Sequence, residues 1–201
     1  MSKPKLYLGI SGVAGSGKDS LCQIIIEQAK ELGLNAKRYA LADPLKQKIN
    51  PFLIKECGID LNSCSRAEKD QVRSLLVAFG KCKRHQSKGQ YWTSLTDSII
   101  YDDPEDVDIA VISDIRYVDY GETDELGWLQ HKHGGRLFHV TLLKHGEVLL
   151  PPNQDEERND PKIAKLADSC VVWSLGEHKD ESCHKYIQDK LKEFLNINYA
   201  Y

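Results

Sequence analysis

The sequence lacks any apolar run of the roughly 18–20 residues that a membrane-spanning helix needs, so we expect no such helix. It also lacks an excess of one charge, because 27 Lys and Arg residues stand against 30 Asp and Glu, for a formal net charge of −3. That balance argues against a general binder of nucleic acid or of membrane surfaces. The six cysteines include no Cys-x-x-Cys pair, which favours reduced thiols in a cytoplasmic protein over a disulfide framework or a structural zinc site.

The chain is longer than one average domain of about 150 residues and shorter than two. We therefore expect a single domain, residues 1–201, that carries an insertion. Hydrophobic residues make up 41% of the chain and charged residues 28%, which is ordinary for a folded protein and argues against wholesale disorder.

Short apolar runs alternate along the chain with segments of helical periodicity. The expected strands are 6–11, 36–41, 107–113, 137–143 and 169–173, and the expected helices begin at 18 and 43 and cover 66–79, 91–100, 122–132 and 180–195. This alternation predicts an α/β fold with a doubly wound parallel sheet. A more polar, helical block within about 42–101 is expected to lie over the sheet, and the charged stretch 151–165 to form a mobile excursion.

The strongest signal is a glycine-rich turn between the first expected strand and the first expected helix. It consists of Gly12, Val13, Ala14, Gly15, Ser16, Gly17, Lys18, Asp19 and Ser20. Glycines let the backbone bend so that successive N–H groups can meet phosphate oxygens, and the helix N-terminus adds partial positive charge. Lys18 can reach the β- and γ-phosphates of a nucleotide. The alternative is a turn with a purely structural role.

Asp19 stands where the strict phosphate-loop pattern has Ser or Thr, and Ser20 follows one place later. Three roles are open for Asp19. It could engage Mg²⁺, directly or through water, while Ser20 supplies a hydroxyl ligand. It could orient or deprotonate the acceptor. It could also only cap the helix.

The strand expected at 107–113 ends in Ser113-Asp114-Ile-Arg116. An apolar strand that ends in Asp resembles the strand that carries an Mg²⁺-linked carboxylate in phosphate-loop NTPases. Because ligands gather at the carboxyl ends of parallel strands, we expect Asp114 to lie near the glycine-rich turn. Arg116 could then contact the transferring phosphate, since a guanidinium matches phosphate oxygens. A simple Asp–Arg surface pair is the alternative.

Further cations are expected to neutralise the phosphates of an acceptor and a donor. The candidate acceptor-binding residues are Lys46, Arg73, Arg84, Trp92, Asp114 and Arg116. Trp92 could stack on a base or pack in the core. Arg158, with Lys162 and Lys165, lies in the charged excursion, which could close over ATP and exclude water, or could be a plain surface loop.

These motifs together resemble the phage deoxynucleoside monophosphate kinases, a branch of the P-loop kinases. The matching stretches are Gly12 to Ser20, Leu41-Ala-Asp-Pro-Leu-Lys46, Arg73-Ser-Leu-Leu with Gly80, Arg84 and Trp92, and Ser113-Asp-Ile-Arg-Tyr117. Three features depart from that family, and one of them is Ser174, which stands where the family often has an asparagine after the last strand. Its acidic residue after Asp-x-Arg could correspond here to Asp119 or Glu122, and its His-x-Ser-Glu feature is replaced by Asn153-Gln-Asp-Glu156.

The resemblance implies a P-loop kinase fold in which about 42–101 binds the acceptor and about 144–168 forms the lid. It implies transfer of the γ-phosphoryl group of ATP to a (deoxy)nucleoside 5′-monophosphate, with Mg²⁺. The partners would be small nucleotides, neither nucleic acid nor membrane, with a homodimer allowed, in the cytoplasm (of the host, if the protein is viral). One alternative is a kinase of another phosphorylated metabolite, such as one like phosphomevalonate or dephospho-coenzyme A. The other is a nucleotide-binding regulator or a nucleic-acid partner, which the basic run 81–88 suggests.

Overall fold

The computed structural model describes residues 3–174 and 181–196. Its centre is a mainly parallel sheet. The strands are β1 (Leu6–Ser11), β2 (Ala36–Tyr39), β3 (Ile109–Ile115), β4 (Arg136–Lys144), β5 (Glu147–Val148) and β6 (Ser169–Ser174). Their order is β2-β3-β1-β4, with β6 parallel to β4 and the short β5 antiparallel to its end. The expected α/β fold with a mainly parallel sheet is thus confirmed.

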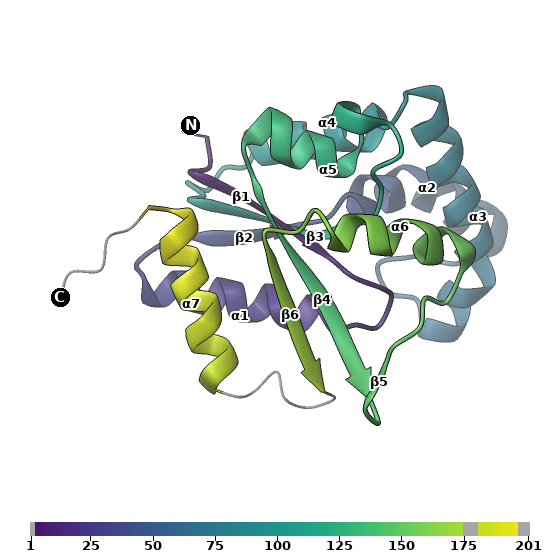
Figure 1. Cartoon of the computed structure of the whole chain (residues 1–201). Helices are drawn as coiled ribbons and strands as arrows, with labels where there is room; N and C mark the ends of the chain where they lie inside the picture. Colours follow the sequence, from purple (N-terminus) through teal and green to yellow (C-terminus); the bar gives the residue numbers. More distant parts are fainter. Residues whose placement is uncertain (1–2, 175–180, 197–201) are drawn as a thin grey trace.

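Helices cover both faces of the sheet (Figure 1). They are α1 (Lys18–Glu31), α2 (Ala42–Cys57), α3 (Arg66–Gln86), α4 (Gln90–Tyr101), the 3-10 turn η1 (Gly121–Thr123), α5 (Glu125–Gly127), the π-helical turn η2 (Trp128–Lys132), α6 (Gln154–Ala164) and α7 (Glu181–Phe194). No helix among the described residues is long and apolar enough to cross a bilayer.

Strand β1 is buried along its whole length, because each face of the sheet has its own apolar core. Leu8 and Ile10 point to the side covered by α1 and α7. Tyr7 points to the opposite side, where α5, η2 and Ile163 of α6 pack. A strand covered on both faces reads as a continuous apolar run, which is why the sequence predicts it well.

Helices α2 and α3 form a small core of their own, made by Ile49, Leu53, Ile59 and Val72. A capping box starts α3: the Ser65 hydroxyl accepts the Glu68 N–H, and the Glu68 carboxylate accepts the Ser65 N–H. These helices and α4 are the helical block expected within 42–101, and Figure 1 shows α2 and α3 at one end of the molecule.

Several expected boundaries are wrong. The second strand ends at Tyr39 and not at 41, and α2 starts at Ala42, before Asp43 and Pro44. The third runs from Ile109 to Ile115, so Asp114 lies within it. The expected helix 66–79 continues to Gln86, and Gly80 lies inside it without the positive φ that would end a helix.

Two expected segments have a different structure. The helix expected at 122–132 is broken into η1, α5 and η2. The stretch 151–165, expected to be a mobile excursion, contains the helix α6, whose first turn is capped because Asn153 Oδ1 accepts the Glu156 N–H at 3.0 Å. The last expected helix is α7, which starts at Glu181, while Asp180 lies outside the described residues.

Candidate functional site

The glycine-rich turn connects the carboxyl end of the central strand β1 to the N-terminus of α1. Gly12, Gly15 and Gly17 all have positive φ values, of 134°, 85° and 95°. A Cβ on Gly12 would lie 2.4 Å from the Val140 carbonyl oxygen, so both conformation and space require glycine there. The turn therefore has the location that a phosphate-binding loop needs.

Lys18 is the first residue of α1, and its side chain folds back over the turn. Its ammonium donates hydrogen bonds to the carbonyl oxygens of Gly12 and Val13, at 2.8 Å each. Burial lowers the pKa of Lys18 to about 8, and the nearby Arg116 guanidinium adds to this shift. An ammonium held this way would gain from an anion beside it.

Two serines of the turn differ in their surroundings. Ser16 is buried, and its hydroxyl has no hydrogen-bond partner within the described part of the chain. Ser20 is half-buried in the first turn of α1, next to the exposed Asp19. The turn thus holds a buried polar atom that a ligand oxygen could satisfy.

Asp114 has a structural task in addition to the predicted metal role. Its Oδ1 accepts the N–H of Leu41 at 2.7 Å and its Oδ2 that of Ala42 at 2.9 Å. It therefore joins β3 to the N-terminus of α2, where a negative charge is favourable. Each carboxylate oxygen keeps a second lone pair, so Asp114 could still bind a cation.

Helix α6 lies against the turn through Glu156. One oxygen of this carboxylate accepts the Ala14 N–H at 2.7 Å, and the other accepts from Arg116 Nη1 at 3.2 Å. Glu156 thus brings the glycine-rich turn and Arg116, the two phosphate-binding features predicted from the sequence, to the same point.

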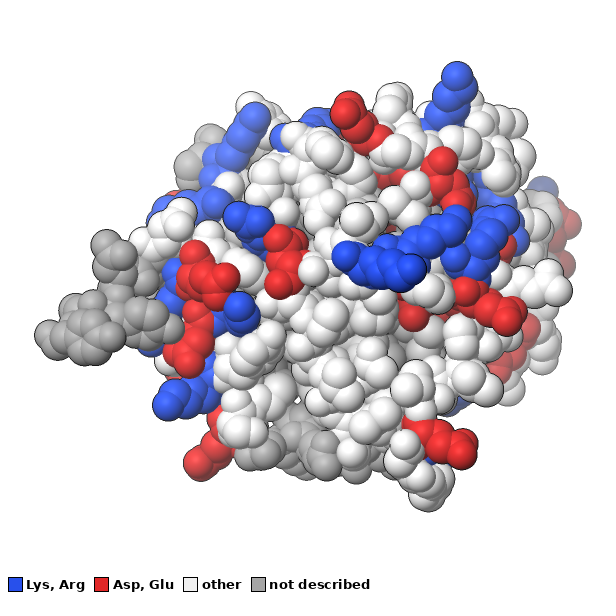
Figure 2. Space-filling model, in the orientation of Figure 1, with Lys and Arg blue, Asp and Glu red and all other residues white. Residues whose placement is uncertain are grey.

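Asp119 makes a second set of contacts with α6. Its carboxylate lies 3.4 Å from Arg158 and 3.6 Å from Lys162 of that helix, and 3.2 Å from Arg84 of α3. Figure 2 shows Lys and Arg side chains gathered over α6 with acidic side chains beside them. Arg158 thus lies within the predicted lid, about 144–168, where its guanidinium pairs with the Asp119 carboxylate.

A cavity of about 210 Å³ opens beside Arg116. Five of the six predicted acceptor-binding residues line it, namely Lys46, Arg84, Trp92, Asp114 and Arg116. Trp92 is held in place because its indole N–H donates to the Gly80 carbonyl oxygen at 3.0 Å. Arg73 is not part of the cavity lining: its exposed side chain pairs with Asp70 on the same helix. The structure therefore does not bring Arg73 to this site.

Arg84 was predicted to contact a phosphate of the acceptor, but only 4% of its surface is exposed. Its guanidinium donates to both oxygens of Asp124, including a bond of 3.1 Å from Nε, and lies over the Tyr117 ring at 3.9 Å. Its charge is thus largely compensated within the protein, which favours a role in shaping the cavity wall.

Glu125 is a cavity residue that sequence reasoning missed. It is buried and accepts the backbone N–H groups of Arg116 at 2.6 Å and of Tyr117 at 3.1 Å. Burial raises the pKa of Glu125 to about 8, and the neighbouring Asp114 adds to the rise. The only sequence signal was an acidic pair in front of the apolar Leu126–Leu129 stretch. Glu125, and not Asp119 or Glu122, holds the backbone that follows Asp-x-Arg.

A buried histidine lies close to the turn. The side chain of Ser11, at the end of β1, is 3.0 Å from His139 Nδ1, and Asp160 of α6 is 3.7 Å from His139 Nε2. Burial lowers the pKa of His139, although Asp160 opposes this shift. His139 thus connects α6 to the sheet beside the turn.

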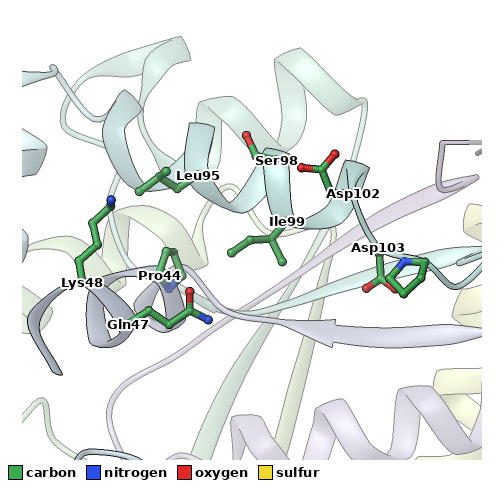
Figure 3. A pocket seen from close by; sticks show the side chains of 9 residues that line it. Pro44, Gln47, Lys48, Leu95, Ser98, Ile99, Asp102 and Asp103 are labelled. Atoms are coloured by element: carbon green, nitrogen blue, oxygen red, sulfur yellow. The ribbon is translucent and has the colours of Figure 1, made fainter. Parts of the chain in front are cut away.

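A second, larger hollow of about 480 Å³ lies between α2 and α4. Figure 3 shows its lining, which includes Lys48, Ser98 and Asp102. No residue of the glycine-rich turn lines it. The same is true of the smaller cavity, but Arg116, which lines it, shares the Glu156 carboxylate with the Ala14 N–H of the turn. We therefore place the candidate site at the smaller cavity, which three predicted cations, Lys46, Arg84 and Arg116, also line.

Comparison with known proteins adds no argument to these observations. No protein-family model matches the chain, and no curated protein sequence matches it. Solved structures that match include an unliganded crystal structure of a sugar kinase from Janibacter sp. HTCC2649, which is 15% identical over 96% of each chain with a TM-score of 0.40. A likeness of that degree carries no argument about function.

Proposed function

We propose that this chain transfers the γ-phosphoryl group of ATP to a (deoxy)nucleoside 5′-monophosphate, giving the diphosphate. One observation carries the proposal. Arg116 lines the cavity and, through the Glu156 carboxylate, shares an anion with the Ala14 N–H of the turn. A single guanidinium thus stands between the proposed donor site and the proposed acceptor site, where the transferring phosphoryl group would pass.

The donor half of the site is the turn with Lys18. Backbone N–H groups and the N-terminus of α1 would bind the phosphates, and Lys18 would follow the charge that moves to the transferred group. With a pKa of about 8, Lys18 is mostly protonated at pH 7. Phosphates beside it would strengthen that protonation.

The acceptor half is the cavity. Lys46 and Arg116 supply positive charge at its wall, and Trp92 supplies an apolar surface beside Gly80. Lys46 comes from α2, Arg116 directly follows β3 and Trp92 comes from α4, so the acceptor would be held between the sheet and the helical block. Catalysis would then rest on positioning two polyanions and on offsetting their charge.

The oxygen atoms of Asp19, Ser20 and Asp114 are of the kind that binds Mg²⁺. The described residues contain no cluster of three or more His, Cys, Asp or Glu side chains that could hold a metal ion on its own. Mg²⁺ commonly binds through one or two carboxylates together with phosphate oxygens. Asp19, Ser20 and Asp114 would hold it here, and the ion would offset the negative charge of the β- and γ-phosphates.

The basic run 81–88, which raised the alternative of a nucleic-acid partner, has partners within the protein. Lys81 pairs with Asp155 of α6, and Arg84 is buried against Asp124. These ion pairs leave less free positive charge on this helix than the sequence suggests. They support a small-molecule enzyme over a nucleic-acid binder.

The test is a coupled ADP-release assay with ATP and a panel of acceptors. The panel contains the four deoxynucleoside and four ribonucleoside 5′-monophosphates, phosphomevalonate and dephospho-coenzyme A. We expect turnover with at least one nucleoside monophosphate. Turnover only with one of the two metabolites would replace the proposed acceptor class, and no ADP release with any acceptor would contradict the proposal.

Two lysines of α1 provide a matched pair of variants. Lys18→Ala should remove turnover, whereas Lys30→Ala, at an exposed position in the last turn, should leave it unchanged. Circular dichroism of both variants would show that the fold is intact. Near-normal turnover of Lys18→Ala would contradict the assigned donor site.

A further inference from the structure

The Glu156 carboxylate makes its contacts mainly outside its own helix. It occupies the third position after the Asn153 cap, where a carboxylate often bonds back to the cap backbone. Here its two oxygens accept hydrogen bonds instead from the Ala14 N–H of the turn and from Arg116, which directly follows β3. The Asn153 side-chain amide donates to the same carboxylate at 3.2 Å, and only 11% of the Glu156 side chain is exposed.

The groups that Glu156 binds are the groups that a phosphate would use. A backbone N–H of a glycine-rich turn and an arginine guanidinium are both donors suited to an oxyanion. A carboxylate presents two such oxygens. Glu156 and a phosphate group would therefore compete for Ala14 and Arg116, and their negative charges would repel each other if both stayed at this point.

The rest of α6 has attachments that do not involve the turn. Ile163 is buried in the core beneath the sheet. Asp160 faces His139, and Arg158 and Lys162 lie beside Asp119. A change limited to the first turn of α6, or to the Glu156 side chain, could thus free the glycine-rich turn while the helix stays docked.

We infer that Glu156 is an intramolecular ligand of the phosphate loop, which closes the donor site until the phosphates of a nucleotide displace it. The same displacement releases Arg116 toward the transferring phosphate, so that donor binding prepares the acceptor side. This inference rests on the proposed function. ATP can bind only after the Glu156 contacts are broken. The apparent affinity for ATP therefore equals the affinity of the open form multiplied by the fraction of molecules that are open.

The test is equilibrium binding of a nonhydrolysable ATP analogue with Mg²⁺, measured by calorimetry on the full chain. Removing the Glu156 charge should raise the affinity, and we expect Glu156→Gln to bind about five- to tenfold more tightly than the unmodified protein. Glu156→Asp, whose shorter side chain reaches less far, should fall between the two. Glu157→Gln is the matched control, because Glu157 is exposed on the same turn and should leave the affinity unchanged.

A second reading of the Glu156 contacts is that they hold the turn in shape for the nucleotide. In that case Glu156→Gln would bind the analogue more weakly, or no better than Glu157→Gln, and the inference would be overturned while the proposed function stands. If neither the unmodified protein nor any of these variants binds the analogue, the proposed function fails and the inference fails with it. The melting temperature of each variant without nucleotide shows whether it is folded.

Discussion

The indole of Trp173, in β6, donates its N–H to the carbonyl oxygen of Ser16 in the glycine-rich turn, over 2.9 Å. The same ring fills the space beside Gly17, where a Cβ would lie 2.7 Å from Trp173 Cζ2. A strand far along the sequence thus fixes both the position of the turn and the residue type that it can contain.

Gly17→Ala should therefore destabilise the protein. The substitution places a side chain at a φ of 95° and against the Trp173 ring. Gly33→Ala is the control, because its φ is 73° but no atom lies within 4 Å of the added Cβ. Both variants carry the backbone strain, so the difference in free energy of unfolding isolates the clash, which we expect to be about 1–3 kcal/mol by urea denaturation. Equal losses would show that the ring does not restrict this position.

The buried Glu125 carboxyl predicts a specific pH dependence of stability. Its pKa is about 8 in the folded protein and near 4.5 when unfolded, so between these values the folded state holds a proton that the unfolded state releases. The Glu125 contribution to the free energy of unfolding should therefore fall as the pH rises from about 4.5 to about 8, and then level off. Glu125→Gln should remove this part of the slope.

Urea denaturation at several pH values between 5 and 9 measures that slope. The control is Glu122→Gln, because Glu122 is exposed nearby and should change the slope little. If the unmodified protein and Glu125→Gln show the same dependence on pH, Glu125 is ionised in the folded state over the whole range, and its assignment as a proton-holding group is wrong.

We expect Arg116 and Arg73, both predicted from the sequence to bind the acceptor, to differ in their effect on kcat/KM. Arg116 lines the cavity, whereas Arg73 is exposed and pairs with Asp70. We expect Arg116→Ala to lower kcat/KM by about a hundredfold or more, because it removes a charge from the transferring phosphate. Arg73→Ala should stay within about twofold of the unmodified protein, as surface substitutions usually do. A large loss for Arg73→Ala would mean that the acceptor site extends along α3.

Asp119 should control how firmly α6 is attached. Its carboxylate faces Arg84, Arg158 and Lys162. Asp119→Asn removes the charge that these cations share, so hydrogen exchange of the α6 amides should become several times faster. Exchange of the β1 amides, in the buried centre of the sheet, provides the internal reference. Unchanged exchange in α6 would show that Ile163 and the remaining contacts of α6 hold the helix without Asp119.

The features that follow from local sequence were predicted well. The turn, β1 and α1 come from glycine spacing and from a change of hydrophobic period within Leu6–Glu31. Lys18 and Arg116 were found in the same way, because each stands at a fixed offset from the end of a buried strand. Whether these residues have the predicted roles stays open to the experiments above.

The parts that were missed depend on contacts between distant segments. Glu125 matters because it meets the backbone after Arg116, and no local pattern encodes that meeting. Helix α6 was hidden because its residues are mostly charged and include Pro161, while its attachment comes from Asp119, His139 and the core. Arg73, predicted for the acceptor site, does not line the cavity, because spacing along a helix does not show which side faces a cavity.

The two hydrogen bonds that Asp114 accepts also link one wall of the cavity to the sheet. Since this carboxylate accepts hydrogen bonds from the backbone N–H groups of Leu41 and Ala42, the wall that α2 contributes is anchored to β3. Another part of the wall comes from α3, where Lys81 forms an ion pair with Asp155 of α6. A molecule entering the cavity would therefore meet one wall that is hydrogen-bonded to the sheet and another that is linked to α6 by an ion pair, which salt weakens.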